Sequence, residues 1–119
     1  KIGILHGAAS YLCQNKEGQI NETESISAGL DYPGVSPIHC FLKDIKRARY
    51  TYATDEEAID AHVMVTKHEN INPSLEPSHA FAEAIKIAPK LSKDTIIIVN
   101  SCGDAKKDRD ILRERLGKK

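Results

Sequence analysis

The sequence lacks a net charge and any long apolar run. Its 17 basic and 17 acidic residues cancel, so no overall field favours nucleic acid or an anionic membrane. The longest apolar run, residues 96–99, is far too short to span a bilayer, and the N-terminus has no charged-then-apolar signal pattern. We therefore expect a soluble protein whose partners are neither nucleic acid nor membrane.

Cysteine and clustered glycine are also scarce. The three cysteines, Cys13, Cys40 and Cys102, are odd in number and share no close spacing, which favours a reduced cytoplasmic protein over a disulfide framework. Residues 99–103 contain a single glycine and so lack the second and third glycines of a dinucleotide-binding fingerprint. The sequence has no internal repeat and no low-complexity segment.

What the sequence does contain is an alternation of strand and helix patterns, in a chain long enough for one domain. A hairpin is predicted from residues 2–13, with a break at 7–9, and residues 19–23, around a turn at 15–18. The predicted helices are 37–47, 54–69, 77–88 and one from 104 to about 116, and the predicted later strands are 48–53 and 95–99. We expect an α/β fold in which strands alternate with helices after the hairpin and the sheet is mostly parallel.

Two places favour a site. The loop at residues 25–37 sets one acid, Asp31, between two glycines and two prolines, a composition that serves either to place groups or simply to connect elements. Glu76 precedes Pro77, so we expect an extended conformation where a helix begins, although glutamate is not a favoured N-cap. A functional role and a favourable charge at a helix N-terminus both remain open for Glu76.

Three motifs together resemble the tryptophan synthase beta chain family, pyridoxal-phosphate enzymes that join serine and indole. They are G-L-D-Y-P-G-V at 29–35, L-E-P-S-H-A at 75–80 and V-N-S-C-G at 99–103, and the resemblance is colinear over essentially all 119 residues. It implies part of a fold-type II pyridoxal-phosphate fold, and a parent lyase that makes L-tryptophan from L-serine and indole by β-replacement. It also implies an alpha chain and a beta homodimer as partners of the parent.

The resemblance assigns roles to residues around the cofactor. Glu76 matches a glutamate that faces substrate and cofactor, where a carboxylate can hand a proton to the leaving hydroxyl. Cys102 stands where the family usually has a serine that contacts the pyridine nitrogen, and Ser101 takes that role if the alignment slips by one residue. A small buried thiol is the alternative for Cys102. The family's usual G-R-G-D-K-D reads G-D-A-K-K-D here, at 103–108.

The remaining roles concern closure, the indole route and a cation. Asp31 matches an aspartate that pairs with an arginine of a mobile domain when the active site closes. Leu5 and His6 match residues along the route of indole, with an ordinary strand histidine as the alternative for His6. The last set matches backbone carbonyls that bind a monovalent cation, and its members are Leu30, Tyr32 and Gly34.

Two motifs of the family are missing. None of the twelve lysines follows a histidine, as the cofactor lysine does in H-K-x-N, and no two glycines are adjacent, as they are in the G-G-G-S-N phosphate loop. The chain also starts at Lys1 and at once enters the apolar residues 2–5. We expect residues 1–119 to be a single C-terminal segment, roughly the last third, of a longer enzyme, which is inactive and self-associating when isolated. The alternative is a stand-alone ligand-binding or regulatory module that retains part of the fold.

Overall fold

The computed structural model describes residues 1–117, which divide into two compact units. Unit 1 comprises Lys1–Ser25 and Gly29–Tyr50, and unit 2 comprises Ile26–Ala28 and the chain from Thr51 onward. No helix within residues 1–117 combines the length and the apolar character that a membrane span requires. We describe each unit by itself.

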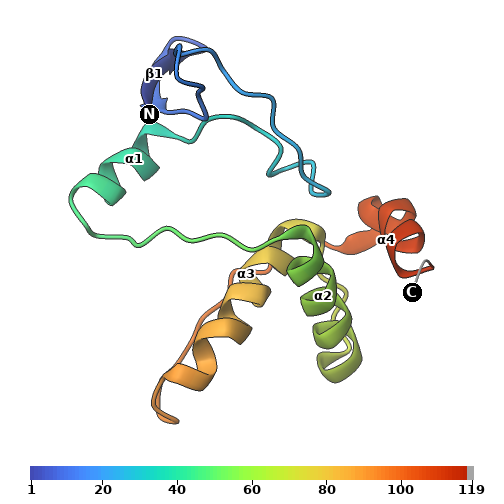
Figure 1. The fold of residues 1–119 in the computed structure, drawn as a ribbon. Coiled ribbons are helices and arrows are strands. Elements are labelled where there is room, and N and C mark those ends of the chain that lie inside the picture. The colour runs from blue at the N-terminus through green and yellow to red at the C-terminus, as the bar shows by residue number, and fades with distance from the viewer. Residues whose placement is uncertain (118–119) are drawn as a thin grey trace. The chain divides into compact units, whose positions relative to one another are not determined.

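Unit 1 begins with a hairpin of β1 (Ile2–Leu5) and β2 (Ala8–Tyr11), paired antiparallel with Ile2 opposite Tyr11 (Figure 1). His6 and Gly7 form the turn, both at positive φ (50° and 76°), the geometry of the tight turns that join antiparallel strands. The predicted turn at 15–18 also forms, with Gly18 at φ 86° and a single bridge from Gln14 to Ile20. The predicted strand at 19–23 is therefore wrong, because β2 is the partner of β1 and, within residues 1–117, Ile20 is the one residue of that segment that forms a bridge.

Helix α1 (Pro37–Asp44) completes unit 1. It starts where the sequence predicts, with Ser36 as the N-cap and Pro37 in the first turn. It ends three residues before the predicted 47, because Lys46 adopts a left-handed conformation and the Arg47 amide donates back to the Leu42 carbonyl, as in a Schellman motif. The helix contacts β2, where the Tyr11 hydroxyl donates to Asp44 at 2.7 Å.

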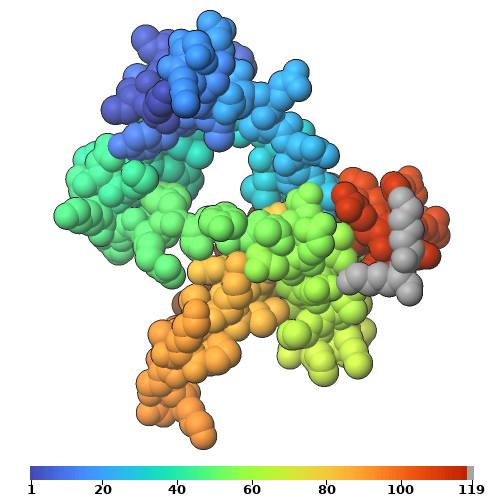
Figure 2. All heavy atoms as spheres, viewed as in Figure 1, coloured from blue at the N-terminus to red at the C-terminus, as the bar shows by residue number. Residues whose placement is uncertain are grey.

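Unit 2 is built on α2 (Asp55–Glu69) and α3 (Leu75–Ile87). The predicted capping box is present, because Thr54 and Glu57 each accept from the other's backbone amide. The two helices contact each other extensively near their first turns and diverge toward their C-terminal ends (Figures 1 and 2). A short 3₁₀ turn, η1 (Ala88–Lys90), ends α3 beside Pro89.

The C-terminal part of unit 2 folds onto the start of α3. A 3₁₀ turn, η2 (Ala105–Asp108), leads directly into α4 (Arg109–Leu116). Together with residues from α2, α3 and the segment 26–28, they form the buried apolar cluster of the unit, which consists of Ile26, Ile59, Leu75, Ala105 and Leu112. Burial of this cluster is what holds residues 105–112 against α3.

The structure combines a hairpin with helices, but the expectation of a mostly parallel sheet is not met in residues 1–117. The only sheet there is the antiparallel pair β1–β2, and residues 48–53 and 95–99 are not strands. Ile96 and Ile98 are 86% and 91% exposed. A β-branched run favours the extended conformation, but it becomes a strand only when a neighbouring strand supplies backbone partners.

Candidate functional site

The first turn of α3 carries Glu76. Ser74 is the N-cap, in an extended conformation, so Glu76 and Pro77 are the second and third residues of the helix. The predicted start at Pro77 is thus two residues late, and the extended conformation predicted for Glu76 is wrong. Proline fits this position because the amides of a first helical turn have no partner within the helix.

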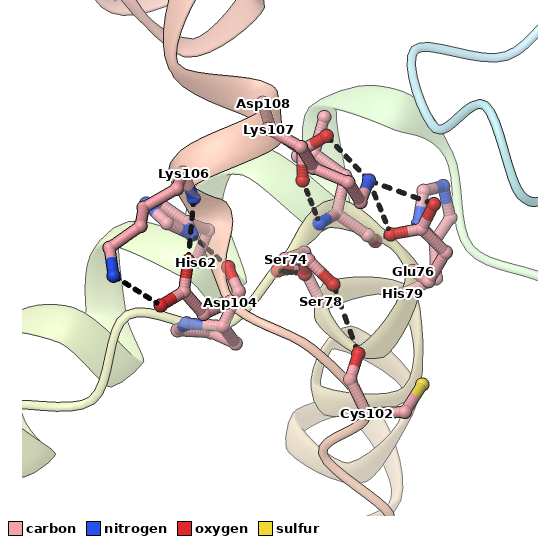
Figure 3. Close-up of polar contacts among 12 residues, drawn as sticks. His62, Ser74, Glu76, Ser78, His79, Cys102, Asp104, Lys106, Lys107 and Asp108 are labelled. Atoms are coloured by element: carbon pink, nitrogen blue, oxygen red, sulfur yellow. Dashed lines mark hydrogen bonds and ion pairs between the residues drawn. The ribbon is translucent and has the colours of Figure 1, made fainter.

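Asp108, more than thirty residues away in sequence, caps this turn. The Ser74 hydroxyl does not cap α3, because it donates to the Cys102 carbonyl at 3.1 Å. The Leu75 amide instead donates to Asp108 Oδ2 at 2.8 Å (Figure 3). A carboxylate at a helix N-terminus accepts orphan amides and interacts favourably with the helix dipole. Asp108 is 3% exposed, so this contact is a fixed point of unit 2.

Lys107 joins the two acidic residues. Its Nζ lies 2.6 Å from Asp108 Oδ1, 3.0 Å from Glu76 Oε1 and 2.9 Å from Glu76 Oε2 (Figure 3). Partial burial lowers the pKa of Lys107, but the hydrogen bonds to Asp108 and Glu76 outweigh it and leave that pKa above its usual value. The ammonium therefore keeps its charge beside the Glu76 carboxylate.

The segment that holds Ser101 and Cys102 passes the same end of α3. The Cys102 carbonyl accepts from Ser74, and both Ser101 and Cys102 are exposed. Gly103 adopts φ 89°, and a Cβ there would lie 3.3 Å from the Ser74 hydroxyl, so glycine permits both the turn and the close approach. The prediction of a buried thiol as the alternative for Cys102 is wrong in this structure. Glu76 and residues 101–103 thus lie around one helix N-terminus.

Two histidines, one from α2 and one from α3, contact residues around the N-terminus of α3. His62 is buried, and its Nδ1 lies 2.9 Å from the Pro73 carbonyl. The Nδ1 of His79 lies 2.7 Å from the Leu75 carbonyl, and its Nε2 lies 3.7 Å from Asp55 Oδ1. These contacts link α2 to the residues just before and after Ser74. Within residues 1–117 no three His, Cys, Asp or Glu side chains are grouped as metal ligands.

The other predicted residues lie in unit 1. Leu5, His6, Tyr32 and Gly34 line a cavity of about 270 Å³ together with Ala8, Ser10, Leu12, Val35 and Ser36. The Tyr32 hydroxyl and His6 Nδ1 are 2.7 Å apart, with the two rings tilted against each other. The alternative of an ordinary strand histidine does not describe His6, which occupies the turn between β1 and β2.

The loop of Asp31 is tied to the hairpin by backbone contacts. The Tyr32 amide donates to the Leu30 carbonyl at 3.1 Å, and the Cys13 amide donates to the Pro33 carbonyl at 2.7 Å. Leu30 and Asp31 are exposed. A Cβ at Gly34 would lie 2.8 Å from Leu12 Cδ2, so glycine is required for the close approach of the two segments.

Sequence reasoning missed Lys107 and Asp108 as parts of the site. In the sequence, the G-D-A-K-K-D stretch at 103–108 stands out only as a departure from the family's usual motif. The partners of these two residues, Leu75 and Glu76, are more than thirty positions earlier, so no local pattern joins them.

Comparison with known proteins identifies relatives over nearly the whole chain. No family model matches it. Over 117 residues, 98% of this chain, it is 52% identical to the tryptophan synthase beta chain of Bordetella petrii, and over 115 residues it is 54% identical to that of Allorhizobium ampelinum. The chain spans 29% and 28% of the length of these relatives. It is therefore homologous to part of the tryptophan synthase beta chain, and the resemblance drawn from its motifs is confirmed.

Proposed function

We propose that this chain is the C-terminal segment of a tryptophan synthase beta chain and supplies the ring-facing and proton-handling groups of its active site. The parent enzyme would join L-serine and indole to L-tryptophan, as a beta homodimer in complex with an alpha chain. The observation that carries the proposal is the gathering of Glu76 and residues 101–103 at the N-terminus of α3, within a chain 50–54% identical to such enzymes.

The residues present fit one side of pyridoxal phosphate. The Cys102 thiol and the Ser101 hydroxyl are exposed beside the start of α3, and either can hydrogen-bond to a pyridine nitrogen. The sequence has neither a lysine after a histidine nor adjacent glycines, so the cofactor lysine and the phosphate loop are left to other parts of the parent. When bound, the cofactor supplies the electron sink that lets the substituent on the β-carbon of serine be exchanged.

Glu76 is the proton-handling residue in this proposal. Its carboxylate lies in the first turn of α3 and contacts the Lys107 ammonium. Carboxylates positioned in this way typically contribute a factor of about 10² to 10⁴ by general acid–base catalysis. Here the protonated form of the group would deliver a proton to the hydroxyl that leaves serine as water, and the resulting carboxylate would take up the proton that indole loses when its bond to the β-carbon forms.

Unit 1 would handle indole and closure. The cavity beside Leu5 and His6 has an apolar wall and a polar His6–Tyr32 pair, which suits a flat heteroaromatic molecule with one N–H. Asp31 would pair with an arginine of a mobile domain in the parent. The carbonyls of Leu30, Tyr32 and Gly34 would bind a monovalent cation.

The test is Glu76→Ala in the full-length protein. We expect tryptophan formation from serine and indole to fall by at least a hundredfold while the cofactor stays bound, because the carboxylate acts on the substrate. Glu83→Ala is the matched control, since it removes a carboxylate from the same helix that contacts Lys86. Loss of cofactor together with activity would indicate a structural role for Glu76. Full activity would show that Glu76 is not the proton-handling residue.

The isolated chain should neither bind pyridoxal phosphate specifically nor make tryptophan. It should also self-associate, because Ile96 and Ile98 are exposed in an extended segment without a strand partner among residues 1–117. Absorbance titration with cofactor and sedimentation at micromolar concentration test these points. A saturable, stoichiometric lysine adduct or a strictly monomeric, thermally stable species would favour a stand-alone module.

A further inference from the structure

We infer that Lys107 is a positioning residue, which holds the Glu76 carboxylate in its working orientation by bridging it to the buried Asp108. The inference rests on the proposed function, because it concerns the residue that handles the proton there. It assigns a task to a lysine that the sequence alone presents as one of several in a basic C-terminal stretch.

The geometry fixes the carboxylate as well as neutralising it. The Lys107 ammonium lies within 3.0 Å of both Glu76 oxygens and 2.6 Å from Asp108. Lys107 donates a hydrogen bond to Oε1 at 3.0 Å and forms an ion-pair contact with Oε2 at 2.9 Å, and the two contacts together restrain the carboxylate. Charge-assisted hydrogen bonds of this length are also about twice as strong as neutral ones.

The bridge is anchored at its far end. Asp108 is buried and accepts from the Leu75 amide, one residue before Glu76. Asp108 thereby binds the backbone of the α3 first turn with one oxygen and the lysine with the other. Glu76 is held from both sides, by its own helix and by η2, and the lysine cannot shift without disturbing a buried contact.

The adjacent lysine provides an internal comparison. Lys106 has a side chain that is 80% exposed, and within residues 1–117 it forms a 3.7 Å ion pair with Asp104, whose side chain is 55% exposed. The two lysines are neighbours in η2 and have the same chemistry, but Lys107, unlike Lys106, lies against Glu76 and Asp108. Lys106→Met is therefore a matched control for Lys107→Met.

The experiment measures the steady-state kinetics and the pH profile of kcat in the full-length enzyme. We expect Lys107→Met to lower kcat by at least tenfold with a KM for serine within about twofold, because the misplaced carboxylate acts in the chemical step. Lys107→Arg, which keeps the positive charge, should recover part of kcat. Lys106→Met should match the unaltered enzyme.

The pH profile separates positioning from general damage. Within residues 1–117, the charged and titratable groups around Glu76 include Lys107 and Asp108 of η2, and His79 of α3 with its partner Asp55 of α2. Removing the ammonium takes away a positive charge that contacts the Glu76 carboxylate, so Glu76 is protonated more easily. The limb of the profile that reports Glu76 should move to higher pH by roughly one unit.

Lys107→Gln repeats the test if Lys107→Met yields little folded protein, since it keeps a donor and loses the charge. An unchanged kcat and profile in either folded variant, with Glu76→Ala inactive, would overturn this inference and leave the proposed function intact. Full activity of Glu76→Ala would overturn both.

Discussion

Replacing Asp108 should loosen the start of α3 by an amount that the contacts allow us to estimate. Asp108→Ala removes the acceptor of the Leu75 amide and one partner of Lys107. Loss of a helix cap costs about 1 kcal/mol, and a hydrogen bond to a charged group is worth about 1.5–3 kcal/mol. The lysine side chain is 50% exposed, so water takes over much of its lost interaction. We expect about 2 kcal/mol of local destabilisation.

Amide hydrogen exchange measures this local free energy directly. A loss of about 2 kcal/mol corresponds to roughly 30-fold faster exchange, since each 1.4 kcal/mol is tenfold. The effect should be confined to the first turn of α3, with Leu75 most affected. Asp108→Asn keeps an acceptor and should give about half the effect. Asp104→Asn, at the exposed cap of η2, is the control. Unchanged protection of Leu75 in Asp108→Ala would refute the capping role.

Three further predictions concern other parts of the chain. Gly34→Ala should lower the melting temperature, with a cost of about 1–3 kcal/mol, because its Cβ would meet Leu12 at 2.8 Å. The hydrogen bond from Lys86 holds the pKa of Glu57 below its ordinary value of 4.5. Their contact therefore stabilises the fold above pH 4.5, and this stabilisation is lost as the pH falls further. Below pH 4.5, the stability of Glu57→Gln should depend less on pH than that of the unaltered protein, as measured by acid unfolding. In the full-length enzyme, Cys102→Ser should bind pyridoxal phosphate as tightly as the unaltered protein does, whereas Cys102→Ala should bind it up to about tenfold more weakly. Identical affinities in the two variants would show that residue 102 does not contact the cofactor ring.

Local signals in the sequence account for much of unit 2. The capping box at Thr54 and Glu57 fixes the start of α2 where the sequence predicts it. The end of α3 beside Pro89 is likewise close to the predicted 88. Such elements depend on residues three or four positions apart, which is the range that pattern reasoning covers.

The errors arise where the outcome depends on distant partners. The predicted strand at 95–99 has the right composition, but nothing in residues 1–117 pairs with it. The start of α3 was misjudged because Pro77 occupies the third helical position, with Asp108 satisfying an amide before it. The hairpin closes at His6 and Gly7, because both adopt positive φ, a conformation that histidine accepts more readily than most residues other than glycine.

In the candidate site, too, local sequence signals could be recognised and contacts between distant residues could not. The motif containing Glu76 could be singled out from sequence, because glutamate is not a favoured N-cap and yet precedes a proline at a predicted helix start. Lys107 could not, since its role depends on contacts with Glu76, which lies thirty-one positions earlier. The roles assigned to all of the site residues, those of Glu76 and Cys102 included, stay predictions.

The most direct test of the account is a chimera. The segment of the Bordetella petrii beta chain that aligns with this chain over 117 residues would be exchanged for the present sequence, and tryptophan formation from serine and indole would be measured together with cofactor content. The account predicts a cofactor-loaded enzyme that makes tryptophan and loses this activity with Glu76→Ala but not with Glu83→Ala. A folded, cofactor-loaded chimera that makes no tryptophan would contradict it.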